Sequence, residues 1–333
     1  MSNNNKSNSN SGLKPCPITN SNESVRVLVK AYDQATHQDE EVLICEQTGL
    51  VYVNEPIREN KSYKGDVESL TQEEWNKSFP DDLDVYSDES WGETYQDSKD
   101  VYDWQYENVA NYIGKDQLNR PGFTIVEIGS ARGYLLKRLK ENHPQINAIG
   151  VEPSPIMGKI ARSNGLDMRT GVFEDIGFEP GSVDAIVGFG CFIQVRDPLR
   201  TLKAFNRALR PDGRVVLDSP NSDSMFRYAL LYFYRRPKLT KMLGLQSFVK
   251  KGIDLAYNPG RYFFYSPKTY RLLLEKAGFE VTEVKQRQPR YVVYGKHQLG
   301  VIKGLALKGV STLEKITNKQ AWVQVGARKV NNV

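Results

Sequence analysis

The sequence predicts an α/β fold in which the strands of a parallel sheet alternate with helices. Apolar runs such as Thr124–Ile128 suit strands that are buried on both faces of a parallel sheet. Between such runs, three pairs place a capping residue directly before a proline, namely Ser154-Pro155, Asp197-Pro198 and Ser266-Pro267. This pairing is typical of the first residues of a helix. Alternating strand and helix signals are the pattern of α/β proteins.

Residues 1–120 are expected to hold three segments that precede this sheet. The Asn- and Ser-rich lead over residues 1–12 is predicted to be disordered. Residues 13–55 contain short apolar runs separated by turn residues, at 25–29, 41–44 and 50–53, and are predicted to form a small β unit. Residues 56–120 are acidic and rich in aromatic side chains, with a spacing from Tyr95 to Ile113 that suits helices.

Residues 121–329 carry the signals of the main sheet and its helices. The helix after the first strand presents Leu135, Leu136 and Leu139 on one face, and Pro144 ends it. Gly278 suits the left-handed position that follows the helix opened by Ser266-Pro267. Apolar runs from Phe279 and from Trp322 to Ala327 predict two further strands.

A turn of small residues joins the first strand of this core to its helix. The residues of the turn are Gly129, Ser130, Ala131 and Gly133. Their size lets the backbone approach a ligand closely. Glu127 lies two residues before the turn, and the next strand ends at Glu152. Two acids at strand ends beside a tight turn predict a nucleoside pocket, in which one carboxylate accepts the ribose hydroxyl protons.

The spacing of the turn indicates which nucleoside it suits. The dinucleotide fingerprint has three glycines as G-x-G-x-x-G, whereas this chain has Gly129-x-x-x-Gly133. Glu127 would repel a pyrophosphate, but it suits a cationic amino-acid tail. The turn therefore favours S-adenosylmethionine over NAD, and a nicotinamide dehydrogenase is the less favoured alternative.

From about residue 121 to residue 213 the chain resembles the class I S-adenosylmethionine-dependent methyltransferases. The segments that carry the resemblance follow one another at the family's spacing, namely 127–133, Glu152, 173–178, 182–188 and 209–221. The resemblance implies a Rossmann-like sheet of seven strands, mostly parallel with an antiparallel last strand, and helices on both faces. It also implies S-adenosyl-L-methionine as the cofactor and methyl transfer as the reaction.

The resemblance further implies which residues contact the cofactor. These residues are Glu127, Gly129, Ser130, Ala131, Gly133, Glu152, Pro153, Glu174, Asp175, Phe189 and Gly190. Ala131 stands where the family turn has a glycine. Cofactor binding is expected to survive if the φ angle of Ala131 is negative and to weaken if φ is positive.

The stretch that follows the fourth strand is expected to line the methyl side of the pocket. Many relatives carry Glu-His where this chain has Ile193 and Gln194, so a titratable acid and base are missing. Gln194 can orient a hydroxyl or carbonyl group by hydrogen bonds, and Tyr262 and Tyr265 are the remaining catalytic candidates. Cys191 is expected to pack rather than react, because no histidine is predicted nearby to lower its pKa.

The small β unit resembles the zinc-ribbon head of some relatives, which carries C-x-x-C twice. Each pair has lost one cysteine here, because Thr19 follows Cys16 and Thr48 follows Cys45 at the second position. Two thiolates and two hydroxyls do not supply the closed ligand set that structural zinc requires. We therefore expect a zinc-ribbon-like unit without metal, in which both cysteines are small buried residues.

Two segments are candidates for covering the pocket. In the resembled family the helices before the first strand close over the cofactor, and Trp91 and Tyr95 are candidates for this lid, although aromatic stripes are more often core. Residues 222–264 form a basic and aromatic insertion, and its part 225–251 holds seven Lys and Arg and no acid. The insertion suits a substrate cap, contact with an anionic membrane surface, stacking on RNA, or a helix pair packed on the core.

Composition and charge indicate which compartment and which kinds of partner the protein suits. Residues 1–120 carry 11 Lys and Arg against 23 Asp and Glu, whereas residues 121–333 carry 34 against 17. The two parts are expected to attract each other, or the basic part to face an anionic substrate, unless both are solvated faces. No apolar run approaches the roughly 18 residues of a membrane span. Three distant cysteines and the lack of a signal peptide lead us to expect a cytoplasmic protein.

The sequence thus predicts methylation at oxygen or carbon of a small-molecule or glycan-linked acceptor, which could bear phosphate. The Asn-Pro-Pro-Tyr signature of many nucleic-acid amino methyltransferases is absent from the sequence, which disfavours a nucleic-acid acceptor. The alternative is a methyltransferase-like protein that binds S-adenosylmethionine without catalysis, as the lost Glu-His pair suggests. Oligomeric state and acceptor identity stay open.

Overall fold

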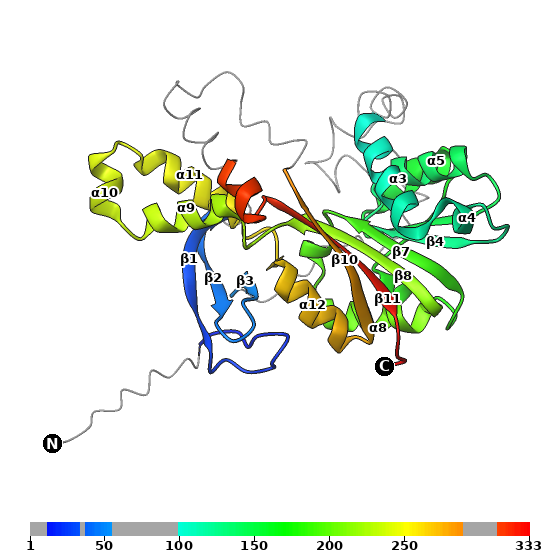
Figure 1. Ribbon diagram of the computed structural model, residues 1–333, viewed down its shortest axis with the longest axis horizontal. Helices are drawn as coiled ribbons and strands as arrows, with labels where there is room; N and C mark the ends of the chain where they lie inside the picture. The colour runs from blue at the N-terminus through cyan, green and yellow to red at the C-terminus, as the bar shows by residue number, and fades with distance from the viewer. Residues whose placement is uncertain (1–11, 34–36, 55–98, 289–311) are drawn as a thin grey trace.

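The computed structural model describes residues 12–33, 37–54, 99–288 and 312–333. Within these residues the chain forms a seven-stranded sheet and a smaller four-stranded sheet (Figure 1). The predicted lead over residues 1–12, apart from its last residue, lies outside the described residues. The same holds for Trp91, Tyr95 and most of the segment 56–120.

The seven-stranded sheet has the predicted topology. Its strands are β4 (Thr124–Ile128), β5 (Asn147–Glu152), β6 (Asp167–Thr170), β7 (Val183–Phe189), β8 (Leu209–Pro220), β10 (Phe279–Arg287) and β11 (Trp322–Lys329). They lie in the order β10-β11-β8-β7-β4-β5-β6. Neighbours from β8 to β6 pair in parallel, whereas β11 pairs antiparallel with both β8 and β10. The antiparallel last strand is thereby confirmed.

Helices cover both faces of this sheet, as predicted. One face carries α3 (Lys99–Ile113), α5 (Tyr134–Asn142) and α6 (Pro155–Ser163). The other face carries α8 (Pro198–Ala208) and α12 (Pro267–Lys276). Leu135 and Ile160 belong to the buried cluster on the first face, and Phe205 and Leu273 to the cluster on the second. The short elements α4 (Lys115–Leu118), α7 (Phe173–Ile176) and the 3-10 helix η4 (Phe192–Gln194) lie in connections.

The helix caps follow the local sequence in two of the three predicted places. The Asp197 carboxylate accepts a hydrogen bond from the Arg200 amide at the start of α8, at 3.0 Å. Ser266 and Thr269 form a reciprocal capping box at the start of α12. Ser154 precedes α6 as predicted, but its side chain makes no capping bond. Gly278 follows α12 with φ at 80°, as predicted.

The small sheet confirms the predicted β unit and extends it. Its strands are β1 (Val25–Asp33), β2 (Gln38–Cys45), β3 (Val51–Val53) and β9 (Phe263–Phe264), all antiparallel in this order. The strand β9 comes from the end of the insertion 222–264, more than 200 residues away along the chain. The N-terminal unit is therefore completed by the C-terminal half of the chain.

The insertion forms three helices instead of a pair. These are α9 (Met225–Tyr234), α10 (Pro237–Met242) and α11 (Gln246–Ala256), and Figure 1 shows them beside the small sheet. Leu230 and Ile253 of these helices share a buried cluster with Val29 and Val42 of the sheet. Lys250 also forms an ion pair with Asp39 at 2.8 Å, which joins the basic and acidic parts of the chain. No described helix is long and apolar enough to cross a membrane.

Candidate nucleoside site at the carboxyl ends of β4 and β5

The site begins where β4 and β5 end side by side. Parallel pairing places Glu127 opposite Gly150, and Glu152 is the last residue of β5. In open α/β sheets the carboxyl ends of the strands form the ligand crevice. The two acids that the sequence singled out thus belong to one end of one pair of neighbouring strands.

The turn after β4 is held by bonds within the protein. The Gly129 amide donates to the carbonyl of Val151 at 2.8 Å. The Ser130 hydroxyl donates to the carbonyls of Glu127 and Val151, at 3.0 and 3.3 Å. A Cβ added at Gly129 would lie 2.4 Å from the Cβ of Cys191. Glycine is therefore required at 129 by Cys191, and the buried Ser130 side chain fixes the turn to β5.

Glu127 is a buried carboxylate with an unused oxygen. Its side chain is 6% exposed, and Oε2 has no hydrogen-bond partner among the described residues. Burial first, and the neighbouring Glu152 carboxylate second, raise the pKa of Glu127 well above its ordinary value. A buried polar atom of this kind costs free energy unless a partner compensates it. A cationic or hydrogen-bond-donating ligand group is the partner that this oxygen suits.

Glu152 is positioned by backbone amides on both sides. Its Oε2 accepts a hydrogen bond from the Ala131 amide at 2.9 Å, and its Oε1 accepts from the Ser154 amide at 2.8 Å. Burial raises the pKa of Glu152, while these two amide bonds act in the opposite direction. The carboxylate therefore joins the glycine turn to the start of α6, and each oxygen retains capacity for a further donor.

Ala131 adopts the backbone conformation that the sequence analysis treated as unfavourable. Its φ angle is 47°, within the left-handed region that disfavours side chains. The exposed Ala131 side chain lies in the turn next to Glu152. The condition set for undisturbed cofactor binding, a negative φ, is therefore not met, and the turn carries strain that a glycine would not.

Glu174 and Asp175 lie on the side of the crevice beyond β5 and have partners on α8. The Thr201 hydroxyl of α8 donates to the Glu174 carboxylate, and Asp175 forms an exposed ion pair with Arg200 at 3.7 Å. Both acids therefore face α8. Pro153 is half-buried directly after Glu152.

Sequence reasoning missed Val172 on that side of the crevice. The amide of its neighbour Gly171 donates to the carbonyl of Glu152 at 2.9 Å, so Val172 follows β6 beside the acid. Its large apolar side chain is exposed there. An exposed apolar group at the carboxyl end of a sheet suits the flat face of a purine. No signal in the sequence pointed to Val172, because the four-residue strand β6 before it is too short to be recognised.

The β7 end of the crevice holds the residues expected on the methyl side. Phe189 and Gly190 are half-buried, and Gln194 of η4 is exposed. The Cys191 thiol donates to the carbonyl of Ile128 at 3.1 Å, and burial raises its pKa. Cys191 is thus a packing residue, as predicted, and it packs directly against Gly129.

A cluster that sequence reasoning missed fixes this end of the sheet. Asp218, near the end of β8, accepts hydrogen bonds from the Gly190 amide at 2.7 Å and from the Arg287 guanidinium at 2.9 Å. The guanidinium carbon lies 3.8 Å from the ring centre of Trp104 on α3 and 5.3 Å from that of Trp322. These residues attach α3 to the loop that contains Gly190.

The two tyrosine candidates lie on the insertion side of η4. Tyr262 is partly buried, and its amide donates to the carbonyl of Ile193 at 2.9 Å. Tyr265 is fully buried, its hydroxyl donates to the carbonyl of Phe192 at 3.5 Å, and burial raises its pKa well above the ordinary value. The structure thus brings Tyr262 close to Gln194, whereas the Tyr265 hydroxyl is used inside the core.

The two cysteines of the N-terminal unit lie together in the buried core. Cys16 and Cys45 are buried free thiols. The Cys16 sulfur lies 3.6 Å from the Thr48 hydroxyl. Burial acts to raise the pKa of Cys45, but hydrogen bonds from Thr48 and Cys16 outweigh it and lower the pKa. The Thr19 hydroxyl donates instead to the carbonyl of Ser21. Among the described residues, no group of three His, Cys, Asp or Glu side chains could hold a metal ion.

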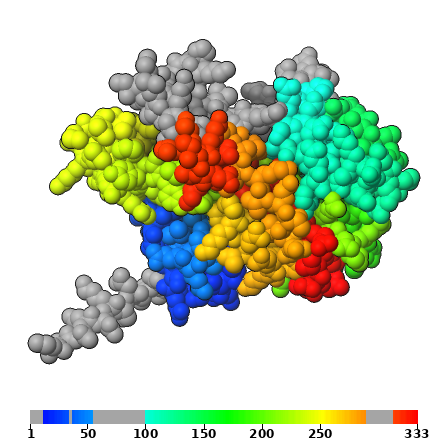
Figure 2. All heavy atoms as spheres, in the orientation of Figure 1, coloured from blue at the N-terminus to red at the C-terminus, as the bar shows by residue number. Residues whose placement is uncertain are grey.

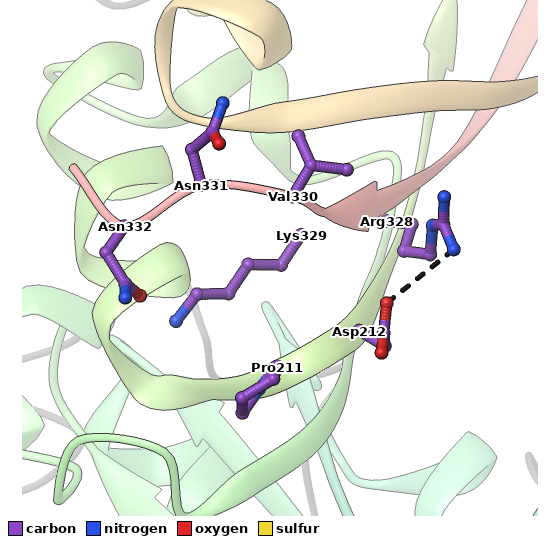
Figure 3. A pocket seen from close by; sticks show the side chains of 7 residues that line it. All are labelled: Pro211, Asp212, Arg328, Lys329, Val330, Asn331 and Asn332. Atoms are coloured by element: carbon purple, nitrogen blue, oxygen red, sulfur yellow. Dashed lines mark ion pairs between the residues drawn. The ribbon is translucent and has the colours of Figure 1, made fainter.

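A pocket of about 340 Å³ lies at the opposite end of the sheet (Figure 3). Pro211 and Asp212 line it near the start of β8, and Arg328 faces Asp212 across a 3.6 Å ion pair. The carboxyl ends of the parallel strands point away from this pocket. It is therefore separate from the crevice between Glu127 and Glu152.

Comparison with known proteins agrees with this geometry. A family described as a methyltransferase domain matches residues 102–284, which is more than half of the chain. A ubiquinone biosynthesis O-methyltransferase of Xanthomonas campestris pv. campestris is 31% identical over 108 residues, covering 30% of this chain and 44% of the relative. A tRNA U34 carboxymethyltransferase of Aliarcobacter butzleri is 25% identical over 189 residues, covering 55% of each chain. The chain thus spans about half the length of these curated relatives.

Similar solved structures include two described as SAM-dependent methyltransferases. The structure from Thermotoga maritima is 22% identical with a TM-score of 0.42, and the match covers 73% of this chain and 97% of that one. The structure from Aquifex aeolicus is 15% identical with a TM-score of 0.41, and the match covers 68% and 89%. By its family match, its sheet order and its two strand-end acids, the chain belongs to the class I S-adenosylmethionine-dependent methyltransferases.

Proposed function

We propose that this protein transfers a methyl group from S-adenosylmethionine to oxygen or carbon of a small-molecule or glycan-linked acceptor. The observation that carries the proposal is the unpartnered, buried Oε2 of Glu127 beside Glu152 and the glycine turn. The amino-acid tail of the cofactor carries an ammonium group that can donate to this oxygen. A bound ammonium favours the ionised form of Glu127 and offsets the cost of burying its charge.

The other residues of the crevice have roles that follow from their positions. Glu152 is held by two amides so that its remaining lone pairs can accept the ribose hydroxyl protons. Val172 offers apolar surface to the adenine, beside Glu174 and Asp175. S-Adenosylmethionine supplies a methyl group made electrophilic by the sulfonium. Phe189 and Gly190 line the methyl side, and Gln194 orients the acceptor by hydrogen bonds.

The acceptor class rests on what the methyl side offers. Gln194 is not titratable, so a hydroxyl already acidified by its own ring or an activated carbon fits better than an ordinary alcohol. The ubiquinone-pathway name of one relative is compatible with such an acceptor. The three free thiols also suit a reducing, cytoplasmic compartment, which forms part of the same proposal.

Turnover with an acceptor panel tests this function. Purified protein is incubated with S-adenosylmethionine and with phenols, catechols, activated methylenes and glycan-linked hydroxyls, and S-adenosylhomocysteine release is measured. We expect release with at least one oxygen or carbon acceptor, and a lower rate in Gln194→Ala. Methylation of amines alone, or of RNA alone, would contradict the proposed acceptor class.

A second candidate function is cofactor binding without catalysis. It is favoured by Gln194 at the position of a family base and by the internal hydrogen bond of Tyr265. In that case S-adenosylhomocysteine binds to the protein while no acceptor is methylated. A single identified methylated product would exclude this candidate.

A further inference from the structure

The helices of the insertion carry a surface that the methyl-transfer proposal does not use. The lobe of α9, α10 and α11 projects beside the small sheet, with α10 at its outer end (Figures 1 and 2). Met242 at the end of α10 is 76% exposed, and the next residue, Leu243, is 49% exposed. Two large apolar side chains are thus adjacent and open to water at the outer end of the lobe.

Cationic side chains surround these two apolar residues. Arg235, Arg236, Lys238 and Lys241 are exposed on and beside α10. None of them forms an ion pair with a described residue, whereas Lys250 on α11 pairs with Asp39 and Asp254. No acidic residue occurs between residues 225 and 251 to reduce this charge. We call Met242, Leu243 and these four cationic residues the α10 tip.

An aromatic side chain borders the α10 tip on α9. Tyr232 is exposed, and the Arg236 guanidinium carbon lies 3.8 Å from its ring centre. Tyrosine is enriched where an apolar layer meets water, because its ring is apolar and its hydroxyl is wet. The tip therefore has an apolar apex, a cationic surround and an aromatic flank.

We propose that the α10 tip docks on an anionic lipid bilayer, with Met242 and Leu243 entering the interface and the four cations facing lipid phosphates. Each of the four cations is attracted to an anionic leaflet, and burial of the Met242 and Leu243 side chains in the bilayer interface stabilises the contact. RNA would also attract the cations, but the exposed methionine and leucine would gain nothing from its phosphate backbone. The apolar apex therefore favours a bilayer. The inference concerns binding alone and does not depend on the acceptor.

Co-sedimentation of the full chain with lipid vesicles tests the inference. We expect binding to phosphatidylcholine vesicles that contain about 30% phosphatidylglycerol, and none to pure phosphatidylcholine. Binding should weaken as salt rises from about 0.1 M to 0.5 M, because salt screens exposed charges. Equal binding to both vesicle types, or no binding to either, would overturn the proposal.

Paired variants separate the two components of the tip. Met242→Ser with Leu243→Ser retains every charge and should weaken vesicle binding by about tenfold or more. Lys238→Gln with Lys241→Gln should weaken it and reduce its salt dependence. Leu255→Ser is the matched control, because Leu255 is 59% exposed but lies at the far end of α11. Its vesicle binding should be unchanged.

A fluorescence measurement reports whether the α10 tip enters the bilayer, separately from how tightly the protein binds the vesicles. An environment-sensitive dye on Leu243→Cys should shift to shorter wavelength when anionic vesicles are added, and the same dye on Leu255→Cys should not. The contradicting result is a double variant, Met242→Ser with Leu243→Ser, that binds vesicles as strongly as the natural chain and is displaced from them by an RNA oligonucleotide. That combined result would show that the surface is a nucleic-acid site and that the proposal is wrong.

Discussion

Ala131 shows how a single methyl group influences this site. Its amide must point at Glu152 Oε2, and this orientation comes with a φ of 47°. A left-handed conformation costs an L-residue roughly 1–2 kcal/mol, and glycine avoids that cost. The chain therefore retains the hydrogen bond at the expense of local strain.

Replacing Ala131 by glycine should stabilise the protein. We expect the free energy of unfolding to rise by about 0.5–1 kcal/mol, because glycine relieves the left-handed strain but adds entropy to the unfolded chain. Urea unfolding measures the change. The control is Ala204→Gly inside α8, which should lose about 0.5–1 kcal/mol. Loss of stability in Ala131→Gly would show that the turn is unstrained.

Glu127 should make the ligand-free protein less stable as pH rises. Its pKa is raised in the folded state by burial and by Glu152, so the folded state holds the proton more tightly than the unfolded chain. The stabilisation is complete below the ordinary glutamate pKa and is lost as pH rises through the raised pKa. Thermal unfolding from pH 4 to pH 9 measures this loss.

The isosteric variant Glu127→Gln supplies the comparison for that pH profile. It cannot ionise, so its stability advantage over the natural chain should grow with pH, to on the order of 1–3 kcal/mol. Added S-adenosylhomocysteine should reverse the order, because its ammonium group requires the carboxylate. Parallel pH profiles for the two proteins would show that Glu127 keeps one protonation state.

At the residue scale, the sequence predicted the parts of the site that are local. Glu127, the turn and Glu152 lie within 26 residues and end two neighbouring strands. Asp218, Arg287 and Trp104 come from three elements far apart in the chain, and only the folded sheet brings them together. Each of the three residues occupies an ordinary position in a strand or helix, so the sequence did not indicate that they form a cluster.

At the scale of elements, α3 is fixed to the loop that contains Gly190 through a buried charge. Arg287 connects Trp104 of α3 with Asp218 of β8, and Asp218 is 1% exposed. The edge of the Trp104 ring also faces Phe189, with ring centres 6.0 Å apart. This cluster explains how the helix that precedes the sheet is held at the carboxyl end of β7.

Removing the guanidinium of Arg287 should destabilise the protein strongly. Arg287→Ala leaves the Asp218 carboxylate buried without its cation, which costs about 3–5 kcal/mol. Chemical unfolding measures the cost, and Arg287→Lys should recover only part of it, since lysine lacks the planar fork. Arg271→Ala breaks an exposed ion pair with Glu275 and should change little. Equal effects for both alanine variants would contradict this role for Arg287.

The small sheet should not depend on a metal ion. Thr19 and Thr48 stand where a zinc ribbon would have two further thiols, and the Thr48 hydroxyl contacts Cys16 directly. We therefore expect a chelator to leave the thermal unfolding midpoint unchanged, and metal analysis to find no stoichiometric zinc. A midpoint that falls in chelator and returns with zinc would show that the site is a retained zinc ribbon.

Two strands escaped sequence analysis because they are very short. β6 spans four residues between Gly165 and Gly171, and β9 spans two residues at the end of the insertion. Such lengths are too short for an alternating pattern to be recognised. Phe263 and Phe264 fall inside the predicted insertion 222–264, and their pairing with Val51 and Tyr52 depends on long-range packing.

At the scale of the whole molecule, two sheets share the chain in an interleaved way. The small sheet takes β1 to β3 from the N-terminal segment and β9 from the insertion. The large sheet and the nucleoside crevice occupy the rest of the core, and α9 to α11 lie beside the small sheet (Figure 1). The small sheet and the large sheet are thus connected by β9 and the residues that follow it, up to α12.

Calorimetric titration with S-adenosylhomocysteine tests the central claim, that the Glu127 carboxylate selects a cationic amino-acid tail in this crevice. The natural chain should bind one equivalent, Glu127→Gln should bind at least about tenfold more weakly, which is about 1.4 kcal/mol, and NAD should not bind. Equal affinity of the two proteins for S-adenosylhomocysteine, or binding of NAD in its place, would contradict the account.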